Sequence, residues 1–222
     1  MHSKNTSQQQ ERSYEQIVRL RYLLFLPREY QAREQRGEKW PLILFLHGMG
    51  ERGDDLELVK IHGIAKIVET QPDFPFIALS PQCPDGNMWW HHNLTLKGLL
   101  DEVMADYAVD PQRVYLTGLS MGGYGTWSLA TSYPELFAAI APICGGGMSE
   151  WMFALKEVPV WAFHGAEDPL VPLERGQRLV DALGAWGGDV RLTVYPGVGH
   201  DSWTQTYENP ELYEWFLQHR RR

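Results

Sequence analysis

The chain has 222 residues, of which 44% are apolar, and this is enough for one globular domain with a sizeable core. Its formal net charge of −8 disfavours a nucleic-acid partner, because an acidic protein repels a polyanion. No apolar stretch reaches the roughly 18–20 residues that a membrane-spanning helix needs, so we expect no integral membrane segment.

The first sixteen residues are polar and lack the hydrophobic centre of a secretion signal. We therefore expect residues 1–16 to form a disordered lead-in and residues 17–222 to form a single domain. A chain whose signal had been removed would look the same, so the compartment stays open, with the cytoplasm favoured over secretion. The sequence does not indicate an oligomeric state. Cys83 and Cys144 form no CxxC pair, and we favour two buried thiols over a disulfide.

Short apolar runs alternate with amphipathic segments along the rest of the chain, which is typical of a mostly parallel sheet with helices on both faces. Several runs are continuously apolar, as expected of strands that are covered on both sides. The predicted strands are 21–26, 42–46, 76–80, 114–117, 138–143, 160–164 and 191–195. Apolar stripes predict helices at about 96–107 (capped by Thr95), 124–132, 179–186 and 212–219, and a weaker one at 56–68 that Gly63 interrupts.

The segment Gly118-Leu119-Ser120-Met121-Gly122 carries the strongest chemical signal. It follows a predicted strand and opens a predicted helix, which is the setting of a G-x-S-x-G nucleophile elbow. The turn is so tight that neighbouring side chains must be absent, and the two glycines meet that need. The alternative is a structural turn whose serine only caps the helix. We interpret Ser120 as a nucleophile.

A serine hydroxyl needs a base, and the base needs an acid to orient it. His200 lies in a glycine-containing loop after the last predicted strand, where the chain order serine, acid, histidine places the base. Asp168 lies in the loop after the preceding strand, and we interpret it as the acid. Glu167 and Asp201 are the competing carboxylates. His47 and His164 each end a strand before a glycine, and we expect them to shape loops.

Taken together, the motifs resemble the α/β-hydrolase superfamily. They are His47-Gly48-Met49-Gly50, then Gly118 to Gly123, then His164 to Asp168, then Gly199-His200. Within it the chain is similar to the phospholipase/carboxylesterase and dienelactone-hydrolase-like branch of serine esterases. Dienelactone hydrolases themselves use a cysteine nucleophile, whereas this chain has Ser120, which favours ester hydrolysis. The resemblance implies an oxyanion hole formed by the backbone N–H groups of Met49 and Met121.

Trp89, Trp90, Trp151 and Trp203 fall in predicted loops near the same edge of the sheet. We expect Trp89, Trp90 and Trp203 to contact substrate, with ordinary packing under the loops as the alternative. The chain has no H-E-x-x-H motif or comparable ligand spacing, so we expect no catalytic metal and no cofactor.

The predicted activity is that of a serine carboxylesterase acting on a small ester substrate. The connections between strands leave little length for a lid, so we expect no large cap domain and a preference for short-chain, aromatic or carbohydrate esters. An acyl-thioesterase or a peptidase would use the same residues. A binding protein with an idle triad is the alternative from another class.

Overall fold

The computed structural model describes residues 19–221, and the expected lead-in at residues 1–16 lies outside them. All seven predicted strands are present. Strands β2 and β4 extend by two or more residues beyond the predicted bounds, and the ends of the other five agree with the prediction to within one residue. Their bounds are β1 Tyr22–Phe25, β2 Trp40–Leu46, β3 Ile77–Pro81, β4 Val109–Leu119, β5 Ala139–Ile143, β6 Val160–Gly165 and β7 Val190–Tyr195.

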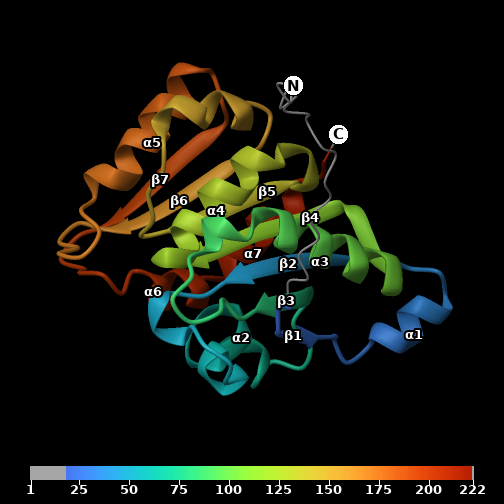
Figure 1. The fold of residues 1–222 in the computed structure, drawn as a ribbon. Coiled ribbons are helices and arrows are strands. Elements are labelled where there is room, and N and C mark those ends of the chain that lie inside the picture. Colours follow the sequence, from blue (N-terminus) through green and yellow to red (C-terminus); the bar gives the residue numbers. More distant parts are fainter. Residues whose placement is uncertain (1–18, 222) are drawn as a thin grey trace, which may run out of the picture.

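The strands form one twisted sheet in the order β1-β3-β2-β4-β5-β6-β7 (Figure 1). Strand β1 pairs antiparallel with β3, and the remaining neighbours are all parallel. The carboxyl ends of β2, β4 and β5 are in register, since Leu46 pairs with Gly118 and Leu119 pairs with Ile143. The loops that follow these strands therefore emerge side by side at one edge of the sheet.

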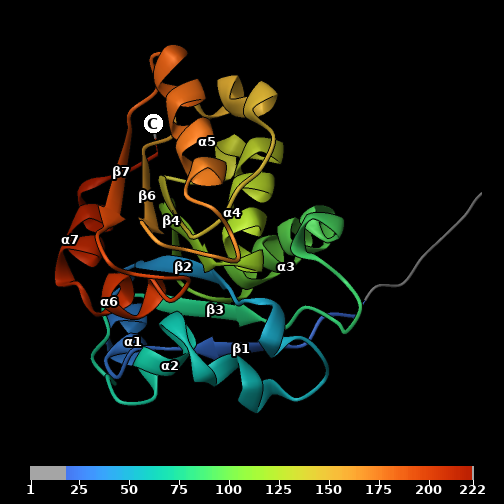
Figure 2. The same ribbon diagram turned by 90° about the vertical axis from the view of Figure 1, so that its left-hand side faces the viewer.

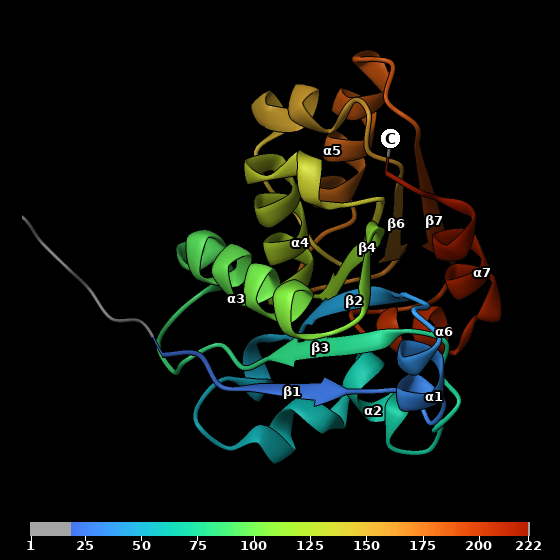
Figure 3. The same ribbon diagram turned by 90° about the vertical axis from the view of Figure 1, so that its right-hand side faces the viewer.

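Helices cover both faces of the sheet (Figures 2 and 3). One face carries α3 Asn93–Asp106, α4 Met121–Ser132 and α5 Glu174–Ala185. The other carries α2 Gly63–Val68, α6 Trp203–Glu208 and α7 Pro210–Gln218. Successive residues of β2 alternate between two hydrophobic clusters, one under each layer, which explains why the whole strand is apolar.

The structure corrects several local predictions. Helix α3 begins at Asn93, so Thr95 lies inside its first turn and the prediction that it caps the helix is wrong. The weak candidate at 56–68 is a 3₁₀ helix, η2 Leu56–Ile61, followed by α2, and the break falls at His62. The sequence missed α1 Tyr30–Gln35, α6 and the further 3₁₀ helices η1 Met49–Glu51, η3 Trp89–His91, η4 Pro134–Leu136 and η5 Ser149–Leu155.

This arrangement is the α/β-hydrolase fold, as the sequence predicted. Between residues 19 and 221 no inserted domain covers the carboxyl edge of the sheet. The helices in that range all lack the length and the apolar character needed to cross a bilayer.

Candidate active site

Ser120 lies at a sharp turn between the central strand β4 and helix α4. Its φ of 53° and ψ of −115° place a non-glycine residue at positive φ, a conformation that costs free energy and must be held by its surroundings. The Ser120 amide donates to the carbonyl of Ile143 at 3.0 Å, and Sγ of Cys144 lies 3.2 Å from the same nitrogen. The turn presents the serine at the edge of the sheet, with the positive end of the α4 dipole directly behind it.

Glycines let the start of α4 press against the neighbouring strands. A Cβ atom on Gly122 would lie 1.9 Å from the carbonyl oxygen of Leu46 in β2, and one on Gly118 would lie 2.4 Å from the Gly122 oxygen. A Cβ on Gly123 would lie 2.3 Å from the carbonyl oxygen of Ile143 in β5. These neighbours are backbone atoms and cannot rotate away, so the elbow requires glycine at all three positions.

The loops after β6 and β7 bring an acid and a base to the serine. His200 Nε2 lies 2.9 Å from Ser120 Oγ, and His200 Nδ1 lies 2.7 Å from Asp168 Oδ2. The two loops touch at Gly165, where a Cβ atom would lie 2.0 Å from the carbonyl oxygen of Gly199. Three side chains that are far apart in the sequence thus form one hydrogen-bonded row at the carboxyl edge.

Asp168 is held as a buried carboxylate. Burial tends to raise its pKa, but the hydrogen bond from His200 and those from the amides of Val171 and Leu170 outweigh this effect, so the pKa is lowered. Asp168 Oδ1 accepts both amides at 2.9 Å, which leaves Oδ2 for the imidazole. A carboxylate in this state orients the His200 ring and stabilises a positive charge on it.

The competing carboxylates lie elsewhere. Glu167 is exposed, and Asp201 accepts hydrogen bonds from the amide and the hydroxyl of Thr204 at 3.0 and 2.9 Å. Asp168 is therefore the carboxylate that contacts His200.

Met49 and Met121 each begin a helix shortly after the carboxyl end of a strand. Met49 is the first residue of η1 and Met121 the first residue of α4, so neither amide has an acceptor within its own helix. The pairing of Leu46 with Gly118 puts the two loops next to each other beside Ser120. Met49 is 49% exposed, so the loop after β2 faces solvent at this point.

His47 and His164 are both buried next to these loops. His47 Nδ1 lies 2.6 Å from the Gly48 carbonyl oxygen, and its Nε2 accepts the amide of Cys83 at 2.9 Å. Burial lowers the pKa of His47 to about 4, although its bond to Gly48 acts in the opposite direction, so the ring is neutral at pH 7. His164 Nε2 bonds the Val171 carbonyl at 2.8 Å. Both rings fix loop backbone, in agreement with the sequence-based expectation.

Comparison with known proteins identifies the family of the chain. The sequence profile of the Phospholipase/Carboxylesterase family matches residues 74–211, which is more than half of the chain. The chain belongs to this family. It is a carboxylic ester hydrolase, as the sequence predicted.

Relatives of this phospholipase/carboxylesterase chain include several kinds of esterase. It is 25% identical to "Acyl-protein thioesterase 1" of Gibberella zeae, over 77% of this chain and 88% of that protein. It is 26% identical to "Probable feruloyl esterase C" of Aspergillus niger, over 86% of this chain and 71% of that protein. A solved structure titled "Crystal Structure of a Thermostable Esterase" superposes with a TM-score of 0.80 at 37% identity and 92% coverage, and this chain spans 60% of its length.

The three tryptophans that were predicted to contact substrate differ in burial and in their contacts. Trp89 is fully buried and its indole N–H donates to the His47 carbonyl at 2.9 Å, so the prediction that it contacts substrate is wrong: it has no exposed surface to offer. Trp203 begins α6 and packs edge-to-face on His200, with the ring centroids 5.3 Å apart. Trp90 is exposed and packs against Tyr124, a residue that the sequence analysis did not single out.

Both cysteines are buried and unpaired, as the sequence favoured. The possible ligand atoms of Cys144, Asp168 and His200 lie within 4.8 Å of one another. Burial raises the pKa of the Cys144 thiol to about 12, however, so this thiol is neutral at pH 7 and a poor ligand, and the other two groups already bond each other. The cluster therefore belongs to the serine site.

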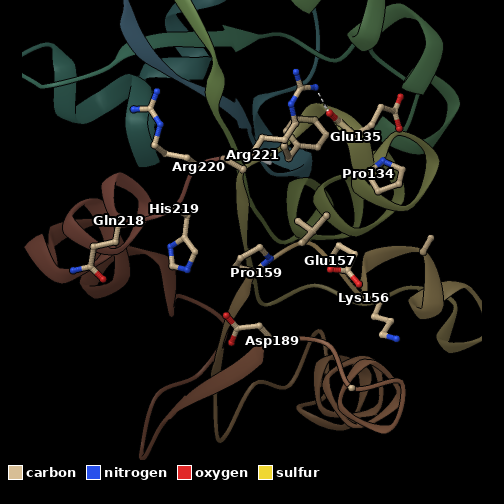
Figure 4. Close-up of a pocket in the computed structure, with 15 residues that line it drawn as sticks. Pro134, Glu135, Lys156, Glu157, Pro159, Asp189, Gln218, His219, Arg220 and Arg221 are labelled. Carbon is tan, nitrogen blue, oxygen red and sulfur yellow. Dashed lines mark hydrogen bonds between the residues drawn. The ribbon is translucent and has the colours of Figure 1, made fainter.

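Two cavities lie at different ends of the esterase. One of about 910 Å³ is at the edge opposite to Ser120, where it is lined by residues that precede β5, β6 and β7 and by the segment 218–221 at the end of α7 (Figure 4). In it the Arg221 guanidinium donates to the Glu135 carbonyl, and charges of both signs are mixed. The other, of about 570 Å³, lies along α4 from Tyr124 to Ser132, and its lining includes the rings of Trp90 and Trp151. The second cavity is the smaller of the two, but it is the one that lies along the helix that follows Ser120.

Proposed function

We propose that this chain is a serine carboxylesterase that works through an acyl-enzyme, with Ser120 as nucleophile, His200 as general base and Asp168 as the orienting acid. The observation that carries the proposal is the continuous hydrogen-bonded row from Asp168 Oδ2 through both nitrogens of His200 to Ser120 Oγ, at 2.7 and 2.9 Å. These distances suit proton transfer from the hydroxyl to the imidazole.

The reaction follows from this row. As Ser120 Oγ attacks the ester carbonyl, its proton passes to His200 Nε2, and Asp168 stabilises the resulting imidazolium. Collapse of the tetrahedral intermediate expels the alcohol, which takes the proton from His200. Water then attacks the acyl-enzyme with His200 again as base, and the carboxylic acid leaves while Ser120 regains its proton.

The developing oxyanion needs two donors, and we assign them to the amides of Met49 and Met121. Each is the first amide of a helix and is free of intrahelical bonds, and the dipole of α4 adds to the effect. His47 holds the Gly48 carbonyl, which belongs to the same peptide plane as the Met49 N–H, so it orients that donor. No step needs a metal or a cofactor, and we expect activity to survive treatment with EDTA.

The substrate preference follows from access to the site. Met49 is exposed and no cap lies between residues 19 and 221, so no lid is present in this range to enclose a long acyl chain. We therefore expect short-chain, aromatic or carbohydrate esters to be preferred over long-chain lipids.

A fluorophosphonate probe tests the chemistry directly. We expect the wild-type chain to be labelled and the Ser120→Ala variant to stay unlabelled and lose esterase activity. If correctly folded wild type takes no label, the triad is idle and the chain is a binding protein on a hydrolase fold.

Thioester hydrolysis is the second candidate, because the chain aligns with "Acyl-protein thioesterase 1" over 88% of that protein's length. Both reactions use the same triad. Comparing kcat/KM on nitrophenyl, feruloyl, acetyl-sugar and acyl-thioester substrates separates them, since a thioesterase would favour the last by a wide margin.

A further inference from the structure

A groove runs along the outer face of α4 and begins one helical turn after Ser120. Its floor contains Tyr124, Ser128 and Ser132, which recur at the four-residue spacing of one helix face. Tyr124 is tied to the nucleophile turn, since its amide donates to the Ser120 carbonyl at 3.0 Å. From Tyr124 to Ser132 the helix rises about 12 Å, so the groove leads well away from the reacting atoms.

The two borders of the groove are aromatic and exposed. Helix α4 lies between α3 and α5 (Figure 3), and η3 and η5 supply the groove with Trp90 and Trp151 respectively. Trp90 is 42% exposed and Trp151 53% exposed, and Trp90 packs edge-to-face on Tyr124 with centroids 6.1 Å apart. Exposed indoles that border a hollow offer flat, rigid contact area and cost little entropy when a ligand covers them.

The floor of the groove carries neutral hydrogen-bonding groups. The Asn93 side-chain amide donates to the hydroxyl oxygens of Ser128 and Ser132, at 2.9 Å in each case, and Thr131 lies beside them. All described residues that line the groove are uncharged. Recognition of an ionic ligand therefore has no basis here. The hydroxyl groups of Thr131 and Ser132 donate to carbonyls of their own helix, which leaves lone pairs on their oxygens to accept hydrogen bonds from a neutral, hydroxyl-bearing ligand.

We propose that this groove binds a neutral oligosaccharide, the part of the substrate that carries the ester. A sugar ring has an apolar C–H face, which suits the indoles of Trp90 and Trp151, and hydroxyl groups at its rim, which suit Ser128, Thr131 and Asn93. The groove runs about 12 Å along α4 and starts one helical turn from Ser120, so an ester at the near end of the sugar chain reaches the nucleophile while the rest of the chain lies along α4. This inference rests on the proposed function, because it identifies the substrate class of that site.

Binding is measured apart from catalysis, in the full-length Ser120→Ala variant, with unesterified xylotetraose and cellotetraose as probes in titration calorimetry. We expect saturable binding of at least one of them. Adding Trp151→Ala, or Trp90→Ala as an independent second variant, should weaken that binding about tenfold, the loss of one aromatic contact. Trp186→Ala is the matched control: Trp186 is 56% exposed but caps α5 outside the groove, and its removal should leave the Kd as it was.

A kinetic measurement on the wild-type nucleophile completes the test. The quantity is kcat/KM for acetylated xylotetraose divided by kcat/KM for 4-nitrophenyl acetate, and we expect Trp151→Ala to lower this ratio about tenfold. Melting temperatures verify that each variant is folded.

The outcomes separate the two proposals. If neither oligosaccharide binds, or if both tryptophan variants bind as tightly as their parent, the groove proposal is overturned while esterase activity stands. Binding of ferulate or of a fatty acid in place of sugar overturns it as well, because the groove is then an acyl pocket. If sugars bind but no ester is hydrolysed and no fluorophosphonate reacts, the catalytic proposal fails and the groove remains.

Discussion

Replacing Gly122 by alanine should destabilise the protein and remove its activity, because this glycine is where α4 touches the central sheet. The added Cβ atom would lie 1.9 Å from the carbonyl oxygen of Leu46 and 2.8 Å from that of His47. Both oxygens belong to the backbone at the end of β2, so relief requires the helix and the strand to move apart by about 1 Å or more, far beyond the tolerance of a close-packed interior.

The magnitude follows from two opposing terms. Alanine favours a helix over glycine by about 1 kcal/mol, whereas overpacking typically costs about 1–3 kcal/mol and, against rigid backbone at 1.9 Å as here, about 3–4 kcal/mol. We therefore expect a net loss of about 2–3 kcal/mol, which lowers the melting temperature by about 4–12 °C in a chain of this size. Because Met121 is next to the altered residue and Met49 follows β2, the two amides also move apart, so kcat should fall at least 10²-fold.

Gly98 provides the matched control. It lies in the interior of α3, it is exposed, and a Cβ atom built on it meets no atom within 4 Å. Gly98→Ala should therefore raise stability by about 1 kcal/mol through helix propensity alone and leave kcat unchanged. Thermal melts followed by circular dichroism, together with hydrolysis of 4-nitrophenyl butyrate, measure both variants. If Gly122→Ala melts within 2 °C of wild type and keeps its kcat, the close approach of α4 to β2 is wrong.

Three further predictions concern the site. Asp168→Asn should lower kcat about 10⁴-fold with little change in KM, because the imidazole loses the carboxylate that orients it; a loss below tenfold would count against Asp168 as the acid. Met49→Ala should cost less than tenfold in kcat because only its amide is used. Gly48→Ala should cost more, about tenfold or above, because its Cβ would lie 2.8 Å from Leu119 Cδ1 and 3.0 Å from Glu51 Oε2, on the peptide that carries the Met49 N–H; equal effects would contradict this assignment. The folded-state pKa of His47, about 4, lies below its ordinary value near 6.5, so this ring stabilises the fold fully above pH 6.5 and loses that contribution, about 3 kcal/mol, as pH falls toward 4. Urea unfolding of wild type and His47→Gln between pH 7.5 and 4.5 should reveal a flatter pH dependence in the variant, and parallel curves would refute the argument.

Much of the fold could be predicted because its signals are local. A strand covered on both faces needs an unbroken apolar run, and β2, β4 and β6 carry such runs. The chain order of Ser120, Asp168 and His200 predicted that these side chains meet, since each follows the carboxyl end of a parallel strand and such ends share one edge. The short helices η1 and η3 were missed because a helix of three residues is too short to show a hydrophobic period in the sequence.

What the sequence by itself determined was the layered sheet and the residue types that stand at its carboxyl edge. Only the tertiary structure decided which of the neighbouring indoles is buried and which is exposed: Trp89 points under the His47 loop, while Trp90 borders the groove on α4. Likewise the motif indicated that Gly122 must lack a side chain, but only the tertiary structure shows which atoms exclude one, namely the backbone oxygens of Leu46 and His47. The physical reason is that periodicity fixes which side of its own element a residue faces, whereas contacts among η3, α4 and η5 depend on how segments distant in the chain pack together.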